Sequence, residues 1–175
     1  MKLSRLLSFA GLGLLLVASG GRAETTVELK GTHLCCGMCV TAVKGILKGV
    51  EGVTGTVDQK AGMVTITAKD DATAQKALDA LAAGGFHGDT GNKKLAIKED
   101  SGAEKGKVKT LTVTGVHDCC GMCNGKIKAT LKKVDGVTAD TAAAKKDTFE
   151  VTGDFDAQDL VKALNAAGFH VKVKK

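Results

Sequence analysis

The sequence has no proline, tryptophan or tyrosine, and only five phenylalanines among its 175 residues. A hydrophobic core must therefore be built from small aliphatic side chains and methionine, which suits small domains of simple topology. Basic clusters interleaved with aromatic residues, which are typical of nucleic-acid-binding surfaces, are absent, so no nucleic-acid partner is predicted. Paired catalytic acids, a nucleotide-binding glycine loop and a Ser-His-Asp arrangement are also absent. Because these motifs are missing, we do not expect an enzyme. The composition, with 25% charged and 43% apolar residues, predicts a soluble globular protein.

No apolar run reaches the ~20 residues that a membrane-spanning helix needs. The chain begins with the basic residues Lys2 and Arg5, continues with an apolar run over 6–18, and then reaches Gly21-Arg22-Ala23. This order is typical of a secretory signal peptide that is cleaved after a small residue, so residues 1–23 are predicted to be removed. We therefore expect an exported protein, periplasmic or extracellular, without a stable membrane anchor.

No cysteine lies outside two short clusters, His33–Cys39 (HLCCGMC) and His117–Cys123 (HDCCGMC), which hold three cysteines each. Export places the protein where disulfides can persist. A bridge within one cluster, however, closes only a tiny loop and removes little entropy from the unfolded chain. The cysteines are therefore not predicted to be a stabilising disulfide framework, and a chemical role is favoured.

An internal repeat organises the chain. The cysteine clusters recur at an offset of 84 residues, and Phe86-His87 recurs as Phe169-His170 at an offset of 83. A polar, glycine-containing stretch over 99–106 separates the two copies and is interpreted as a flexible linker. The predicted organisation is a first domain over 24–98, the linker over 99–106 and a second domain over 107–175.

Both units show the same order of expected elements. A strand precedes the cysteine cluster, a helix begins within the cluster, and a strand hairpin, a second helix and a final strand follow. This βαββαβ order predicts an α+β protein of two tandem ferredoxin-like domains, each an antiparallel four-stranded sheet with two helices on one face. The last strand of the first unit is the weakest, because 88–92 is poor in strand-forming residues and 95–97 offers an alternative.

Two cysteines three residues apart at a helix start can converge on one ion. The positive end of the helix dipole favours thiolate over thiol, and thiolates prefer soft or borderline ions such as Cu(I) and Zn(II). The pairs that fit this description are Cys36 with Cys39 and Cys120 with Cys123.

These CxxC pairs after the first strand, with Phe86 and Phe169 before the last strand, resemble the heavy-metal-associated (HMA) domain of copper chaperones, metal-transport ATPases and periplasmic mercury-binding proteins. The resemblance covers both units. It implies that each CxxC pair binds a soft ion, with Cu(I) first and Zn(II), Hg(II) or Cd(II) as other candidates. It also implies a metal donor or acceptor protein as partner.

The clusters depart from the family motif in two ways. Its methionine is replaced by Leu34, which can keep the apolar packing role, and by Asp118, which predicts a second site that is wetter or differently tuned. An additional cysteine also precedes each pair. The candidate ligands are therefore Cys35, Cys36, Cys39, Cys119, Cys120, Cys123, His33 and His117.

The role of the additional cysteines, Cys35 and Cys119, has two interpretations. As ligands, they would complete a tetrahedral Zn(II) site or a three-coordinate Cu(I) site. As spare thiols, they would point away, because adjacent residues at a strand end face opposite sides.

Four further residues accompany the clusters. Met38 and Met122, between the paired cysteines, are expected to be exposed or half-buried rather than ligands. His87 and His170 begin the last strands, which in this fold run beside the first. Each is expected either to approach the histidine of its own cluster or to lie on the outer sheet surface.

The sequence thus predicts an exported protein that captures, delivers or sequesters soft metal ions at two tandem sites. The alternative is a thiol–disulfide redox protein that uses the two CxxC pairs. The element order and the lack of proline count against that alternative, because thioredoxins carry a cis-proline beside their CxxC. A third interpretation is an interaction module that forms intermolecular disulfides, and the oligomeric state stays open.

Overall fold

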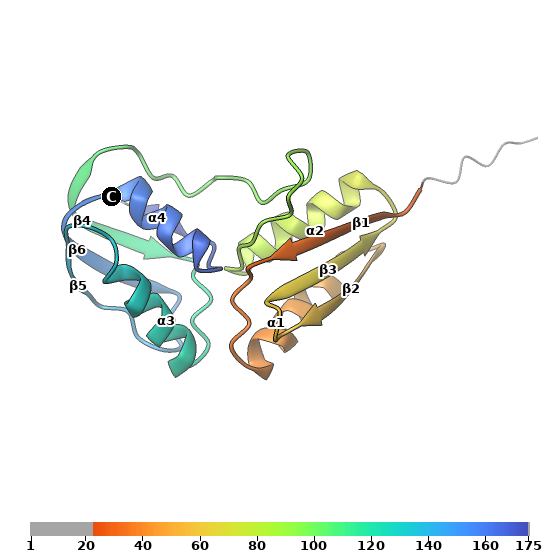
Figure 1. Ribbon diagram of the computed structural model, residues 1–175, viewed down its shortest axis with the longest axis horizontal. Coiled ribbons are helices and arrows are strands. Elements are labelled where there is room, and N and C mark those ends of the chain that lie inside the picture. Colours follow the sequence, from red (N-terminus) through yellow and green to blue (C-terminus); the bar gives the residue numbers. More distant parts are fainter. Residues whose placement is uncertain (1–22, 175) are drawn as a thin grey trace, which may run out of the picture.

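The computed structural model of the protein describes residues 23–174. The predicted signal peptide lies outside the described residues except for Ala23. Within residues 23–174, no helix is both long and apolar enough to cross a membrane. The described chain forms two units that lie side by side and approach each other at the loops preceding the first helix of each (Figure 1).

The first unit contains five regular elements, which are β1 (Thr25–Lys30), α1 (Gly37–Lys48), β2 (Val53–Asp58), β3 (Met63–Ala68) and α2 (Asp71–Ala83). Its antiparallel sheet has the order β1-β3-β2. The fourth strand predicted here is reduced to one bridge between Lys30 and Asp89, with two backbone hydrogen bonds of 2.8 Å. Glycine, aspartate and asparagine dominate this segment and do not sustain a longer ladder.

The second unit contains β4 (Lys107–Thr114), α3 (Gly121–Leu131), β5 (Val137–Asp140), β6 (Thr148–Asp156), α4 (Ala157–Ala166) and β7 (Lys172–Lys174). Its antiparallel sheet has all four predicted strands in the order β5-β6-β4-β7. The ferredoxin-like fold class is therefore confirmed in both units, and only the second has the complete sheet. Valines at 171 and 173 supply the strand propensity that the first unit lacks.

Apolar faces of the helices and sheets form the core of each unit. Val43 and Leu47 of α1 and Leu78 and Leu81 of α2 are buried in the first unit, as the helical spacing predicts. Both second helices begin at an aspartate cap, and Asp70 accepts a hydrogen bond from the backbone N–H of Thr73 at 2.8 Å. Segment 95–97 does not form a strand, although Leu95 and Ile97 are buried.

The segment interpreted as a flexible linker, 99–106, is attached to the second unit along its length. The Asp100 carboxylate contacts Nε2 of His170 at 2.8 Å, and the carbonyl of Ser101 accepts a hydrogen bond from Val173 N–H at 2.8 Å. At the end of the segment, Gly106 N–H donates to the Asp156 carboxylate at 2.9 Å. These contacts hold the segment against the second unit.

Candidate metal centre

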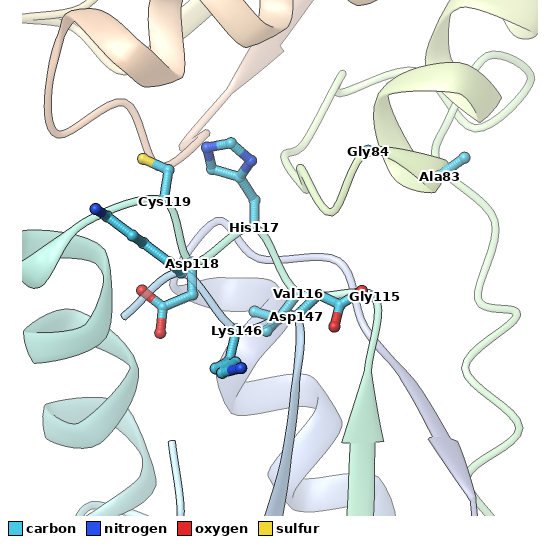
Figure 2. A pocket seen from close by; sticks show the side chains of 10 residues that line it. Ala83, Gly84, Gly115, Val116, His117, Asp118, Cys119, Lys146 and Asp147 are labelled. Atoms are coloured by element: carbon cyan, nitrogen blue, oxygen red, sulfur yellow. The ribbon is translucent and has the colours of Figure 1, made fainter. Parts of the chain in front are cut away.

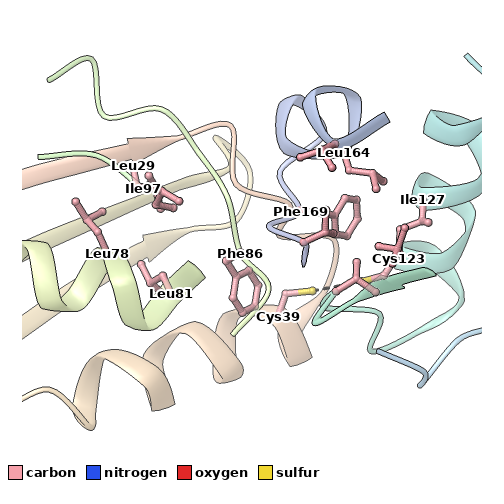
Figure 3. Close-up of a cluster of buried hydrophobic side chains, with 14 of the residues drawn as sticks. Leu29, Cys39, Leu78, Leu81, Phe86, Ile97, Cys123, Ile127, Leu164 and Phe169 are labelled. Carbon is pink, nitrogen blue, oxygen red and sulfur yellow. Dashed lines mark hydrogen bonds between the residues drawn. The ribbon is translucent and has the colours of Figure 1, made fainter. Parts of the chain in front are cut away.

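The two units meet through the segments that follow their second helices. Phe86 and Phe169 form an antiparallel bridge. On either side of it, His87 N–H donates to the Gly168 carbonyl at 3.1 Å, and His170 N–H donates to the Gly85 carbonyl at 3.0 Å. Both phenylalanines are fully buried and lie between the two hydrophobic cores (Figure 3). The interface therefore has an approximate two-fold symmetry that follows the sequence repeat.

Glycine is required at the two positions of closest approach. Gly85 has φ +82°, and a Cβ atom there would lie 2.4 Å from the backbone nitrogen of His117. Gly168 has φ +91°, and its Cβ would lie 2.3 Å from the backbone nitrogen of His33. The conformation and the lack of a side chain both let each loop rest directly on the other unit's cysteine loop.

All six cysteine sulfurs converge at this interface. Within the first unit, Cys35 Sγ lies 3.7 Å from Cys39 Sγ, and within the second Cys119 Sγ lies 3.6 Å from Cys123 Sγ. Between the units, the separation is 3.3 Å for Cys35 and Cys123 and 3.6 Å for Cys39 and Cys119. The sequence predicted two tandem sites, and the structure brings the candidate ligands of both into one cluster.

Helix starts position the sulfurs. Cys36 and Cys120 are the N-caps of α1 and α3, with extended backbone at φ −153° and −158°. Cys39 and Cys123, three residues later, face inward and are fully buried. The extended backbone at the cap lets Cys35 and Cys119 point toward the cluster, so their sulfurs do not face away from the paired cysteines. The positive ends of two helix dipoles consequently face the thiols.

The thiols differ in acidity. The N–H groups of Cys123 and Met122 face the Cys120 sulfur without closing a capping hydrogen bond, and they lower the pKa of this thiol to about 6. Burial raises the pKa of Cys123 to about 11, and burial together with hydrogen bonds to neighbouring sulfurs raises the pKa values of Cys35 and Cys119 strongly. For Cys39, burial is outweighed by contacts to Cys36 and the neighbouring thiols, so its pKa is lowered. The metal-free cluster therefore combines protons with thiolates.

The two cluster histidines pack on the phenylalanine of the opposite unit. The ring centroids lie 4.5 Å apart for His33 and Phe169 and 4.3 Å apart for His117 and Phe86. A ring nitrogen of His33 also lies within 4.8 Å of the sulfurs of Cys35 and Cys123. Burial lowers the pKa of His117, and burial followed by the charge of Lys126 lowers that of His33 to about 4. Both rings are thus neutral near pH 7.

His87 and His170 do not lie on an outer sheet surface, and no group of candidate metal ligands in the described part of the chain contains either of them. They stack on each other across the interface, with centroids 5.7 Å apart and an interplanar angle of 6°. The reason is that the last strand of each unit begins at the contact with the other unit. This contact cannot be predicted from the sequence of one unit considered alone.

Leu34 and Asp118 occupy equivalent places, and both are buried. Leu34 keeps the apolar packing role as predicted. Asp118 was expected to make its site wetter, but its carboxylate is enclosed and accepts a hydrogen bond from Asn124 Nδ2 at 2.8 Å, while Oδ1 has no hydrogen-bond partner. Burial raises the pKa of this carboxyl, against the opposing effects of Asn124 and Lys128.

Met38 and Met122 are 53% and 57% exposed, which confirms the expectation that they lie on the surface. The additional cysteine of each unit instead borders a cavity. A cavity of about 410 Å³ reaches Cys119, with His117, Lys145 and Lys146 in its lining (Figure 2). In Figure 2 the Cys119 sulfur and the His117 ring point the same way, whereas the Asp118 carboxylate points away from them.

The symmetry-related side has a matching cavity of about 380 Å³. Its lining includes His33, Cys35, Lys60 and Lys126. The cluster is therefore accessible from two cavities, each of which ends at one additional cysteine. The cavity at Cys35 is basic, whereas at Cys119 the two lysines are accompanied by Asp118 and Asp147.

No local sequence pattern indicated the shared cluster or the roles of Gly85 and Gly168. A signal was nevertheless present, because the tripeptide Gly-Phe-His occurs in both units, at 85–87 and 168–170. The fold of a single unit does not require this glycine and histidine. Their repetition therefore indicates a common role at the contact between the units.

Comparison with known proteins identified one matching family model and several similar solved structures. Residues 110–170 match the family model of the heavy-metal-associated domain. No curated protein matches the sequence. Similar solved structures include oxidized MerP from Ralstonia metallidurans CH34, with 28% identity over 38% of this chain and 97% of that chain, at a TM-score of 0.36.

Two further structures are similar. A copper binding domain from HMA7, a P-type ATPase, has 21% identity over 39% of this chain and 96% of that chain, at a TM-score of 0.36. The N-terminal soluble domains of Bacillus subtilis CopA have 17% identity over 87% of this chain and 95% of that chain, at a TM-score of 0.30.

Proposed function

The second unit of this chain is a heavy-metal-associated domain, and from this premise we propose that the protein captures soft metal ions at its cysteine cluster and holds them for delivery or sequestration. Cu(I) is the first candidate, with Zn(II) and Hg(II) as further ions, because the donors at the centre are thiol sulfurs and such donors select soft and borderline metals.

The observation that carries the proposal is the convergence of six free cysteines between two helix starts. A redox protein needs two adjacent thiols and a path for its substrate disulfide. Four further sulfurs packed around such a pair add nothing to that exchange. They do add ligands to a metal ion, and the positive helix ends stabilise the thiolates that metal binding requires.

Entry and exit of the metal are proposed to use the two cavities. An incoming thiolate that reaches Cys35 or Cys119 can displace the protein ligands from an ion one at a time. Lys60 and Lys126 line the cavity at Cys35 without an acidic residue, so this side would favour an acidic donor or acceptor protein. The predicted signal peptide supports an exported location, in which such a partner would also reside.

Metal titration tests the proposal. The reduced protein lacking residues 1–23 is titrated with Cu(I), Zn(II) and Hg(II) in competition with chromophoric chelators. The comparison is a variant in which Cys36, Cys39, Cys120 and Cys123 are all changed to serine. We expect tight binding of at least Cu(I) by the natural sequence and loss of that binding in the variant. The proposal fails if no soft ion binds stoichiometrically to the reduced protein.

A further inference from the structure

The six sulfurs occupy the corners of a single octahedron. Neighbouring sulfurs lie 3.3–4.0 Å apart where contacts are formed, and the remaining edges are within 4.8 Å. In this arrangement Cys35 lies opposite Cys119. The other opposite pairs each combine one cysteine of the first unit with one of the second, namely Cys36 with Cys123 and Cys39 with Cys120. Neither unit can form this figure alone.

An octahedron has eight faces, and four alternate faces share no edge with one another. Each sulfur belongs to two of these four faces. Three of these faces are groups whose sulfurs all lie within 4.8 Å of each other, and the fourth has edges of 3.3, 3.7 and 3.8 Å. The four faces are Cys35–Cys36–Cys120, Cys36–Cys39–Cys119, Cys119–Cys120–Cys123 and Cys35–Cys39–Cys123.

These triangles have the size of a trigonal metal–thiolate site. A metal–sulfur bond of about 2.3 Å places the three sulfurs of a planar site about 4.0 Å apart. Eight of the nine edges that form sulfur contacts are 3.6–4.0 Å long, within a few tenths of an ångström of that value, and the ninth, between Cys35 and Cys123, is 3.3 Å. Small side-chain adjustments therefore suffice to seat an ion in each face.

On this basis we infer that the two cysteine loops build one shared site that binds four Cu(I) ions, each held by three sulfurs, with every thiolate bridging two ions. The inference rests on the proposed function and specifies it. Loading four Cu(I) ions onto six thiolates gives a cluster of net charge −2, releases to solvent every proton that the thiols still carry, and changes no oxidation state. Two helix N-termini, together with Lys60 and Lys126 at the cavity beside Cys35, lie where they balance this charge.

The geometry favours Cu(I) over Zn(II) for the full cluster. Zn(II) in structural sites is tetrahedral and needs four mutually close ligands. Any four corners of an octahedron include at least one opposite pair, which is about 1.4 times farther apart than an edge. The cysteines alone therefore offer trigonal holes, which a d¹⁰ Cu(I) ion occupies readily, and no tetrahedral one.

Counting the bound ions by native mass spectrometry tests the inference. The reduced protein lacking residues 1–23 is titrated anaerobically with Cu(I). We expect filling to proceed to four ions per chain, with the four-ion form appearing before intermediate forms accumulate. The variant with both Cys35→Ser and Cys119→Ser retains four sulfurs and is expected to bind at most two ions.

A matched control is the variant with both Met38→Leu and Met122→Leu, because these sulfurs lie between the paired cysteines, in the first turns of α1 and α3, but are exposed. It should still bind four ions. Two ions per chain that fill independently, or any other limit than four, would overturn the shared cluster while leaving soft-metal binding intact. Absence of binding would instead overturn the proposed function itself.

Discussion

The Gly85→Ala substitution should disturb the shared cluster while leaving the fold of each unit intact. Gly85 follows α2 and touches the loop of the second unit, and it is not a core residue of its own domain. The substitution adds one methyl group at the point of closest approach. Both sheets and all four helices should remain, because the residues that bury their apolar faces are unchanged.

The magnitude follows from the distances. The new Cβ would lie 2.4 Å from the His117 nitrogen, whereas ordinary contact begins at 3.4 Å, so the loops must part by about 1 Å. The same displacement carried to the sulfurs lengthens the 3.9 Å separation of Cys36 and Cys120 to about 4.9 Å, beyond the ~4.0 Å of a trigonal site. Overpacking costs about 1–3 kcal/mol, and the left-handed backbone adds about 1–2 kcal/mol.

The assay is Cu(I) stoichiometry by native mass spectrometry, with far-ultraviolet circular dichroism as the measure of folding. Gly91→Ala is the matched control. Its φ of +64° imposes similar backbone strain, but a Cβ there meets nothing within 4 Å. We expect Gly85→Ala to lose the four-ion form with an unchanged dichroism spectrum, and Gly91→Ala to keep it.

If Gly85→Ala still fills to four ions in the same way as Gly91→Ala, the contact between the loops does not hold the cluster together. Such a result would show that the close approach of the loops does not form the shared site, whatever each unit binds on its own.

Three other predictions concern single side chains. Burial lowers the pKa of His33 to about 4, so the unfolded state binds more protons than the folded state between pH 6.5 and 4. The free energy of unfolding measured in urea should therefore be about 2 kcal/mol lower at pH 5 than at pH 7. The His33→Gln variant should show a smaller difference between the two pH values. In the reduced metal-free protein, the rate at which iodoacetamide alkylates Cys120 should increase with a midpoint at pH about 6, at a much lower pH than the rate for Cys35, as followed by peptide mass spectrometry. A midpoint near pH 9 for Cys120 would contradict the proposed effect of the helix start. Asp118→Leu should stabilise the metal-free protein by about 1–2 kcal/mol in the same urea assay, since it removes a buried carboxylate with one unpartnered oxygen; destabilisation would show that Asn124 satisfies the group.

Local sequence patterns were sufficient for the fold of each unit. Helical spacing identified Val43, Leu47, Leu78 and Leu81 as core residues, and the internal repeat gave the domain order. The fourth strand of the first sheet could be anticipated to be weak, because Gly88 and Asp89 disfavour strand structure, but its reduction to a single bridge depends on the surrounding packing.

The site was predictable in composition but not in assembly. Paired cysteines at a helix start followed from spacing alone. Their union into one cluster depends on Phe86 meeting Phe169, residues 83 positions apart whose contact no local pattern specifies. Asp118 shows the same limit, since its burial relies on Asn124 and on the fit of the second unit rather than on its own polarity.

The most direct test of the shared site is X-ray absorption at the copper edge of the protein loaded with Cu(I). Three sulfur neighbours at about 2.3 Å are expected for each ion. In the octahedron, ions at alternate face centres lie two-thirds of an edge apart, or about 2.5 Å for the 3.8 Å edge between Cys39 and Cys123, so a copper–copper shell should appear near that distance. Two sulfur neighbours per ion without a copper–copper shell would show that each unit binds its metal alone.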